Sequence, residues 1–127
     1  MHKILIVDDD LQICQLFGSA LKNAGYQVLI ATSSIEGLKL ALEEHPHIII
    51  SDFAMPDQDG SQFCRAVRDH DEIASVHFIV ITGNGNDELK TDGLSRLFDD
   101  YLEKPVDMPY LVAKVNAVVR RMERVRI

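Results

Sequence analysis

The stretch that decides the fold is residues 48–60, Ile-Ile-Ile-Ser-Asp-Phe-Ala-Met-Pro-Asp-Gln-Asp-Gly. Its apolar start predicts a buried β-strand, and its proline and glycine predict a loop leading away from that strand. Asp52 lies between the two, so we expect its carboxylate to be held at a strand end and open to solvent. Asp8 and Asp9 end another apolar run, residues 4–7. If the two strands are neighbours, three carboxylates meet, which indicates bound metal, phosphate chemistry or both.

Outward from this stretch, strand-like runs alternate with helical patterns. The predicted strands are residues 3–7, 27–31, 47–51, 78–82 and 100–102, and the predicted helical patterns cover residues 13–24, 35–42, 61–69, 87–98 and 109–122. The first, third and fourth strands are apolar almost throughout, as is typical of parallel strands covered on both faces. This alternation predicts a doubly wound α/β fold of five strands and five helices, with a ligand site at the carboxyl ends of the strands.

The helical patterns carry their own start and stop signals. Apolar residues at helical spacing predict buried faces, made of Ile13, Leu16, Phe17, Ala20, Leu21 and Ala24 in the first helix and of Ile35, Leu38 and Leu42 in the second. Asp10, Ser33 and Asp107 each precede a pattern as candidate N-caps. Asp57, Asp59, Asp99 and Asp100 are interpreted as ordinary loop acids.

Length and composition indicate one cytoplasmic domain over residues 1–127. The chain is 46% hydrophobic, which supports a packed core. No apolar run is long enough to cross a membrane, and the start lacks the pattern of a signal peptide. Cys14 and Cys64 fall within helical patterns and are expected to be reduced core thiols.

Charge is distributed unevenly. The formal net charge is −7, and residues 120–127, with four Arg and one Glu, carry +3, so the remaining 119 residues carry −10. An acidic body argues against direct nucleic-acid contact. The basic end at 120–127 is expected to be a solvated helix end or the start of a linker.

The residues at the strand ends form a set suited to phosphoryl transfer. Carboxylates about 4 Å apart repel by about 4 kcal/mol at an effective dielectric of 20, and a divalent cation relieves this. Oxygen ligands suit Mg²⁺, with Mn²⁺ as an alternative. Lys104 follows the fifth strand and Thr82 ends the fourth. An ammonium and a hydroxyl there could bind phosphoryl oxygens while Asp52 acts as the nucleophile.

These residues resemble the receiver domain of bacterial two-component response regulators, over essentially the whole chain. The matching pieces are Ile-Leu-Ile-Val-Asp-Asp at 4–9, Asp52 with Met-Pro at 55–56 and Asp-Gly at 59–60, Ile-Thr-Gly at 81–83, and Asp-Tyr-Leu-Glu-Lys-Pro at 100–105. The resemblance implies the flavodoxin-like strand order 2-1-3-4-5. The spacing of the strands along the sequence does not determine this order.

The resemblance also implies a role for each residue of the set. Asp52 would be the phosphoacceptor, Asp9 a direct Mg²⁺ ligand, Asp8 a ligand mostly through water, and the Ala54 backbone carbonyl a further ligand. Thr82 and Lys104 would contact the phosphoryl group. Tyr101 would be the aromatic switch residue, and the side chains of Ala54 and Asn84 would flank the path of the hydrolytic water.

The implied function is signalling rather than turnover. The phosphoryl donor would be a sensor histidine kinase, a phosphotransfer protein or a small acyl phosphate. Phosphorylation would change the surface around the fourth helix, fifth strand and fifth helix for an output partner or for dimerisation. The domain would catalyse only its own phosphorylation and dephosphorylation.

The main alternative is a small Mg²⁺-dependent phosphatase resembling the haloacid dehalogenase class, with Asp8 as the nucleophile. It would use Asp10, Thr82, Lys90 and the Asp99–Asp100 pair, but it leaves Asp52 and Lys104 unexplained. A flavin-binding module is disfavoured, because three acids stand where its phosphate loop would lie. A receiver-like module that binds partners without being phosphorylated is a further alternative.

Overall fold

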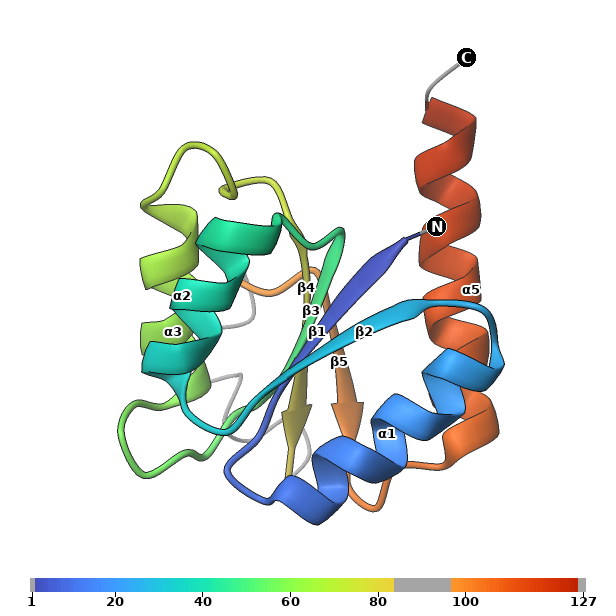
Figure 1. Cartoon of the computed structure of the whole chain (residues 1–127), viewed down its shortest axis with the longest axis horizontal. Coiled ribbons are helices and arrows are strands. Elements are labelled where there is room, and N and C mark those ends of the chain that lie inside the picture. Colours follow the sequence, from blue (N-terminus) through green and yellow to red (C-terminus); the bar gives the residue numbers. More distant parts are fainter. Residues whose placement is uncertain (1, 84–96, 126–127) are drawn as a thin grey trace.

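The chain folds into nine described elements in a computed structural model, which describes residues 2–83 and 97–125 (Figure 1). They are β1 Lys3–Val7, α1 Leu11–Asn23, β2 Gln27–Ala31, α2 Ser34–Glu44, β3 Ile48–Asp52, α3 Gly60–Arg68, β4 His77–Thr82, β5 Asp100–Glu103 and α5 Met108–Val125. The predicted helix at 87–98 lies almost entirely outside the described residues. Residues 120–125 continue α5.

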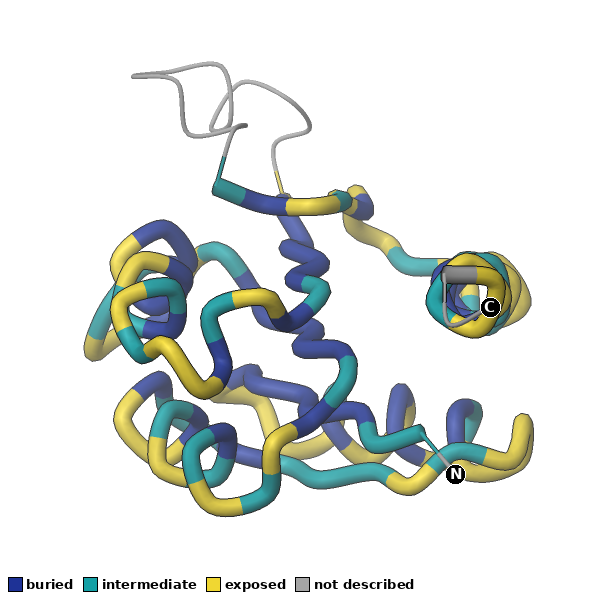
Figure 2. Tube along the Cα trace, turned by 90° about the horizontal axis from the view of Figure 1, so that it is seen from above, coloured by how far each residue is buried: buried dark blue, intermediate teal, exposed yellow. Residues whose placement is uncertain are grey.

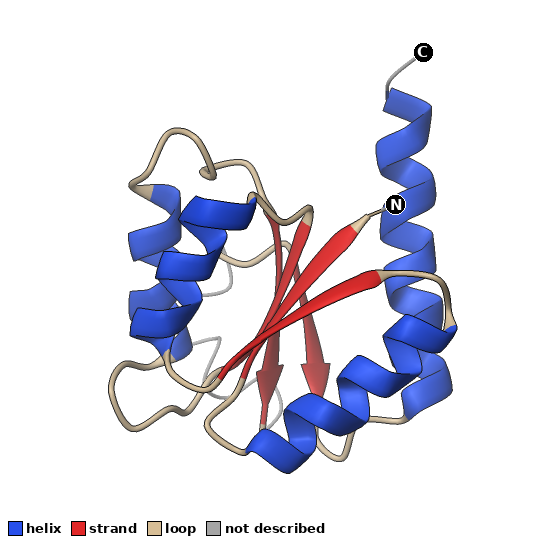
Figure 3. Cartoon of the chain, in the orientation of Figure 1, coloured by secondary structure: helices blue, strands red, loops and turns tan. Residues whose placement is uncertain are grey.

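The strands form one parallel sheet in the order β2-β1-β3-β4-β5, as expected (Figure 3). β1 pairs with both β2 and β3, so the ends of β1 and β3 are neighbours. Helices α1 and α5 cover one face of the sheet, and α2 and α3 cover the other (Figure 1). Among the described residues, no helix is long and apolar enough to cross a bilayer.

Alternate strand residues supply two cores, one on each face. The face under α1 and α5 buries isoleucines of three strands: Ile4, Ile6, Ile48, Ile50, Ile79 and Ile81. The opposite face packs Leu5, Val7, Ile49, Phe78 and Val80 against α2 and α3. Figure 2 shows the central strands buried along their length. Burial on both faces explains why these strands lack polar alternation.

Polar side chains begin each described helix, as the sequence predicts for three of the four. Asp10 accepts from Gln12 N at 2.9 Å, Ser33 accepts from Glu36 N at 3.1 Å, and Asp107 accepts from Tyr110 N at 3.3 Å. Asp59 begins α3 with a capping box shared with Gln62. These bonds satisfy N–H groups that have no partner inside the helix.

Three residues assigned to buried helix faces are exposed: Leu16, Ala24 and Ile35, the last at 73%. In α2 the buried positions are Ser34, Gly37 and Ala41. A Cβ on Gly37 would lie 2.9 Å from Val7 Cγ2, so α2 packs against β1 through small residues. The apolar pattern predicted these helices correctly but misplaced part of the buried face, because small residues score weakly as hydrophobic.

Both cysteines are buried free thiols, as expected. Cys14 Sγ donates to the Asp8 carbonyl at 3.3 Å, and Cys64 Sγ donates to the Leu97 carbonyl at 3.3 Å. Burial raises the pKa of each thiol to about 11. Both therefore stay protonated at neutral pH and act as hydrogen-bond donors in the core.

The partly buried imidazole of His77, at the start of β4, makes the stability of the protein depend on pH. Its Nε2 is buried and lacks a hydrogen bond within the described part of the chain, since the Asp100 carboxylate is 3.6 Å away. Burial lowers the pKa of His77 below 6.5, although the charges of Asp99 and Asp100 oppose this; Arg121 also lowers it. The unfolded chain therefore binds this proton more readily, and stability falls as the pH drops below about 6.5.

Replacing His77 by Val should remove that contribution. We expect the variant to lose less free energy of unfolding than the wild type between about pH 7.5 and about pH 5.5. Urea unfolding followed by circular dichroism at both pH values measures this difference. Equal losses in the two proteins would show that His77 does not titrate differently on folding.

Candidate functional site

The site lies at the carboxyl edge of the sheet, where strand alternation brings three charged side chains to one face. Ile6, Ile50 and Leu102 are buried together under α1 and α5. Asp8, Asp52 and Lys104 each follow two residues later, so the period of two directs them to the same side. The sequence predicted that Asp52 would directly follow the strand, but Asp52 is the last residue of β3.

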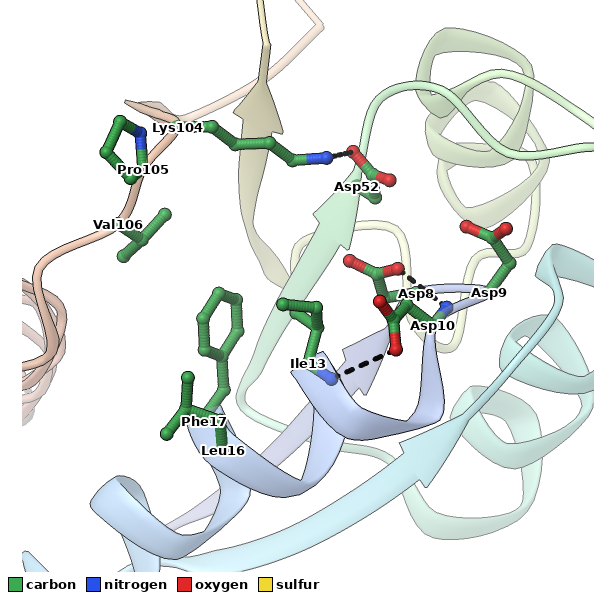
Figure 4. Close-up of a pocket in the computed structure, with 10 residues that line it drawn as sticks. All are labelled: Asp8, Asp9, Asp10, Ile13, Leu16, Phe17, Asp52, Lys104, Pro105 and Val106. Carbon is green, nitrogen blue, oxygen red and sulfur yellow. Dashed lines mark hydrogen bonds and ion pairs between the residues drawn. The ribbon is translucent and has the colours of Figure 1, made fainter.

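The acids and the lysine converge as predicted (Figure 4). Lys104 Nζ lies 3.1 Å from Asp52 Oδ1. Carboxylate oxygens of Asp8, Asp9 and Asp52 all lie within 4.8 Å of one another. Asp52 is only 5% exposed, whereas Asp9 is open to solvent. The cluster thus has a buried side, made by Asp8 and Asp52, and an open side at Asp9.

Asp8 is a buried acid whose surroundings disfavour its charged form. It is 4% exposed, its Oδ1 accepts from Asp10 N at 2.9 Å, and its own N donates to the Ala31 carbonyl at 3.2 Å. Burial, aided by the charges of Asp52 and Asp9, raises its pKa to about 6. An all-oxygen cluster in which negative charge is disfavoured is suited to a hard divalent cation such as Mg²⁺.

The structure also places three of the other predicted residues: Thr82, Ala54 and Tyr101. Thr82 ends β4 and is fully buried, and its carbonyl accepts from Lys104 N at 2.9 Å. Ala54 is exposed in the loop after β3. Tyr101 is 41% exposed on β5 and lines a separate hollow with Glu103 and Tyr110. Asn84 lies outside the described residues.

An apolar wall adjoins the charged cluster. The cavity that contains the acids and Lys104 is lined on its other side by Ile13, Leu16, Phe17, Pro105 and Val106. These residues come from α1 and from the segment after β5 (Figure 4). The charged cluster therefore lies in an open cavity beside an apolar surface.

A family model described as the response regulator receiver domain matches residues 4–116. The chain belongs to the response regulator receiver domain family. Receiver domains take a phosphoryl group from histidine kinases and generally bind Mg²⁺ through an acidic pocket. The chain shows such an acidic cluster, formed from the ends of β1 and β3.

Relatives agree with this assignment. The chain is 36% identical over 125 residues to the DNA-binding dual master transcriptional regulator RpaA of Synechocystis sp., covering 98% of this chain and 52% of that protein. It is 32% identical over 118 residues to the phosphate regulon transcriptional regulatory protein PhoB of Pseudomonas aeruginosa, covering 93% and 52%. The receiver domain thus spans about half the length of these relatives.

Solved structures show the same receiver architecture. The chemotaxis protein CheY4 of Vibrio cholerae matches with a TM-score of 0.86 at 31% identity, covering 93% of this chain and 98% of that one. A response regulator receiver domain protein from Clostridium thermocellum matches with a TM-score of 0.86 at 28% identity, covering 98% and 99%. The family match does not support the phosphatase alternative.

The sequence analysis missed the roles of all four acids that it interpreted as loop acids. Asp99 accepts a hydrogen bond from Phe78 N at 2.8 Å, and Asp100, the first residue of β5, pairs with Lys114 at 2.9 Å. Asp59 caps α3 rather than lying in an ordinary loop. Asp57 bonds across the fold to the start of α2, and the hydrogen bond from Ser34 lowers the pKa of its carboxyl group. The Asp-x-x-Gln spacing of residues 59–62 could have revealed the helix cap at Asp59. No local signal points to the role of Asp57, because its partner Ser34 lies 23 residues away.

Proposed function

We propose that this receiver domain is a phosphorylation switch with Asp52 as its phosphoacceptor. The observation that carries the proposal is the Asp52 carboxylate, held at a strand end 3.1 Å from Lys104 Nζ and within 4.8 Å of two further carboxylates. Neither a simple ion pair nor a solvated acidic loop would require all four groups to meet beside an open cavity.

In the proposed step, a carboxylate oxygen of Asp52 attacks the phosphorus of a phosphohistidine or an acyl phosphate. A new P–O bond forms, the bond to the donor nitrogen or oxygen breaks, and the donor keeps that electron pair. Lys104 then moves from the Asp52 carboxylate to a phosphoryl oxygen, and the Thr82 hydroxyl donates to another. The product is an aspartyl phosphate on Asp52.

Mg²⁺ is the cofactor that this donor set fits. Asp9 and Asp52 would bind it directly, Asp8 mostly through water, and the Ala54 backbone carbonyl would complete the protein ligands. The bound ion would offset the negative charge of the acids and of the incoming phosphoryl group. Mn²⁺, which accepts the same oxygen ligands, is the expected substitute.

The output surface is proposed to lie around β5 and α5. Phosphorylation adds about −1.5 to −2 charges beside Thr82 and Lys104, which biases an equilibrium between two surface states. Tyr101 is the proposed reporter on β5, next to an ion pair of 2.9 Å between Lys114 and Asp100 that joins α5 to the sheet. The partners are a sensor kinase or phosphotransfer protein, an output protein or domain, and a second copy in a phosphorylation-dependent homodimer.

Intact-mass analysis after incubation with acetyl phosphate tests the proposal directly. We expect one added phosphoryl group in the presence of Mg²⁺ and little or none when the metal is chelated, because the donor and the acids repel each other without a cation. No modification under either condition, with acetyl phosphate or with a phosphohistidine donor, would overturn the proposal.

The side chain at position 54 should control the lifetime of the phosphoryl group. Alanine offers no hydrogen bond to an attacking water, so Ala54→Asn is expected to speed dephosphorylation by about fivefold, the rate equivalent of one hydrogen bond of about 1 kcal/mol. The decay of the phosphorylated mass with time measures the rate. Ala54→Val, which adds bulk without a polar group, serves as the control, and an unchanged decay in Ala54→Asn would contradict the prediction.

A further inference from the structure

A single carboxylate ties the loop between β3 and α3, residues 53–59, to the first turn of α2. Asp57 Oδ2 accepts hydrogen bonds from Ser34 Oγ at 2.6 Å, Ser34 N at 3.1 Å and Ile35 N at 3.3 Å. The α2 helix already has its own N-cap, Ser33. Asp57 therefore satisfies further free N–H groups of the helix from a distant part of the chain. Figure 1 shows this loop, in green, passing the start of α2.

The same loop is anchored at its base, next to the phosphoacceptor. Phe53 N donates to the Ile81 carbonyl at 2.9 Å, and Gly60 N donates to the Phe53 carbonyl at 2.5 Å. A Cβ on Gly60 would lie 3.0 Å from Phe53 Cα, so glycine allows α3 to begin this close to Asp52. The loop thus leaves β3 at a fixed point and is tied again at Asp57.

Little freedom is left to the residues between these two anchors. Met55 is 8% exposed and packs in the core under α2 and α3, while the ring of Pro56 fixes its own φ angle. Ala54 therefore lies between the anchor at Phe53 and a buried side chain. If the tie at Asp57 is lost, only the anchor at Phe53 and the burial of Met55 still hold the main chain of Ala54.

The partner of Asp57 is itself fixed relative to the acidic cluster. Ser34 is buried, and three residues later Gly37 packs against Val7 at the end of β1. Asp8 N also donates to the carbonyl of Ala31, the last residue of β2 before α2 begins. The Asp57–Ser34 pair thus joins the loop that carries Ala54 to the strand end that carries Asp8.

We infer that Asp57 and Ser34 are a positioning pair for Mg²⁺, which holds the Ala54 main chain in place relative to the acids of β1. The inference rests on the proposed function, which places Mg²⁺ among these groups. Asp57 acts through the loop and not as a ligand. A loop ordered in advance loses less entropy when the ion binds, so breaking the pair should weaken Mg²⁺ binding about 3- to 10-fold without abolishing it.

Titration of the unphosphorylated protein with MgCl₂, followed by backbone amide chemical shifts, tests this inference. The variants are Asp57→Ala, Ser34→Ala and the double variant. We expect each single change to raise the Mg²⁺ dissociation constant about 3- to 10-fold, and the double change to do no more than Asp57→Ala alone, because the hydrogen bond that Ser34→Ala removes is one of the three that Asp57→Ala removes. Ser34→Ala leaves the net charge unaltered, so it separates positioning from long-range attraction.

Asp71→Ala is the matched control, since Asp71 is an exposed acid on the loop before β4 and its loss changes the charge equally. The Mg²⁺ dissociation constant of Asp71→Ala should differ from that of the wild type by less than about twofold. Phosphorylation by acetyl phosphate should slow in the pair variants at low Mg²⁺ and recover at saturating Mg²⁺, because the ligands remain. Circular dichroism reports folding, and Asp57→Asn, with the weaker neutral acceptor, is a milder variant expected to give an intermediate effect.

If Ser34→Ala binds Mg²⁺ with wild-type affinity, the inference is wrong, whether or not the affinity of Asp57→Ala changes. The proposed function would still stand. A wild-type protein that binds no Mg²⁺ would overturn both. The titration needs no phosphoryl transfer, so failure of Asp52 to be phosphorylated does not interfere with its result.

Discussion

Replacing Asp52 by Asn should abolish phosphorylation by acetyl phosphate and by a phosphohistidine donor. The amide keeps the size of the side chain but is a poor nucleophile, and it removes the charge that pairs with Lys104 at 3.1 Å. With the attacking oxygen lost, we expect a decrease of at least about 10³-fold in the rate of phosphoryl gain, as is found when a covalent nucleophile is removed. Intact-mass analysis over time, in excess Mg²⁺, measures the rate.

Asp71→Asn is the matched control for this change, because it removes one exposed carboxylate far from the cluster and should be phosphorylated like the wild type. Peptide mapping of the wild type should place the phosphoryl group on the segment that contains Asp52. A full phosphoryl gain in Asp52→Asn would show that another carboxylate is the acceptor, and Asp8 would then be the first to replace.

The alternation of apolar runs and helical patterns was enough to predict the architecture, because buried parallel strands need no other signal. The residues of the site could be placed at strand ends or directly after them for the same reason: Asp8, Asp9, Asp52, Thr82 and Lys104. Their meeting required β1 and β3 to be neighbours, and strand order is decided by packing between segments far apart in the chain. That order came from the resemblance to receiver domains and is confirmed by the pairing of β1 with β3.

What the sequence could not reveal depends on close packing and on long-range polar contacts. Ile35 belongs to the apolar pattern of α2 but is exposed, since the buried positions of this helix are Ser34, Gly37 and Ala41, and Gly37 packs closely against Val7 of β1. The sequence alone gives Asp57 the pattern of an ordinary loop acid, whereas the fold places it beside Ser34. In both cases the deciding quantity is the space between two elements, which periodicity within one element does not contain.

The acidic cluster also implies a conflict between stability and function. Asp8 is buried near two like charges, and within the described part of the chain its carboxylate accepts one hydrogen bond, from Asp10 N. Two carboxylates within 4.8 Å repel by a few kcal/mol at an effective dielectric of 20, before the attraction to Lys104 is counted. A residue retained at such a cost contributes to binding rather than to folding, and its removal should stabilise the metal-free protein.

Asp8→Asn should therefore raise the free energy of unfolding by about 1–3 kcal/mol in the presence of a chelator. The amide oxygen can still accept from Asp10 N, so the hydrogen bond is kept while the charge is lost. The same change should greatly reduce the response to the cation: the wild type gains about 1.4 kcal/mol at ten times the Mg²⁺ dissociation constant, and the variant should gain much less at that concentration. Urea unfolding followed by circular dichroism measures both effects.

Asp10→Asn provides the control, because it makes the same charge change two residues away and asparagine is an equally good N-cap for α1. This variant should be neutral or slightly destabilised, since it loses a negative charge at a helix N-terminus, and it should keep its Mg²⁺ response. Opposite signs for Asp8→Asn and Asp10→Asn without metal would show that repulsion within the cluster, and not overall acidity, limits stability. If Asp8→Asn destabilises the metal-free protein, the buried carboxylate is held mainly by its attraction to Lys104, and the cluster imposes no cost on the fold.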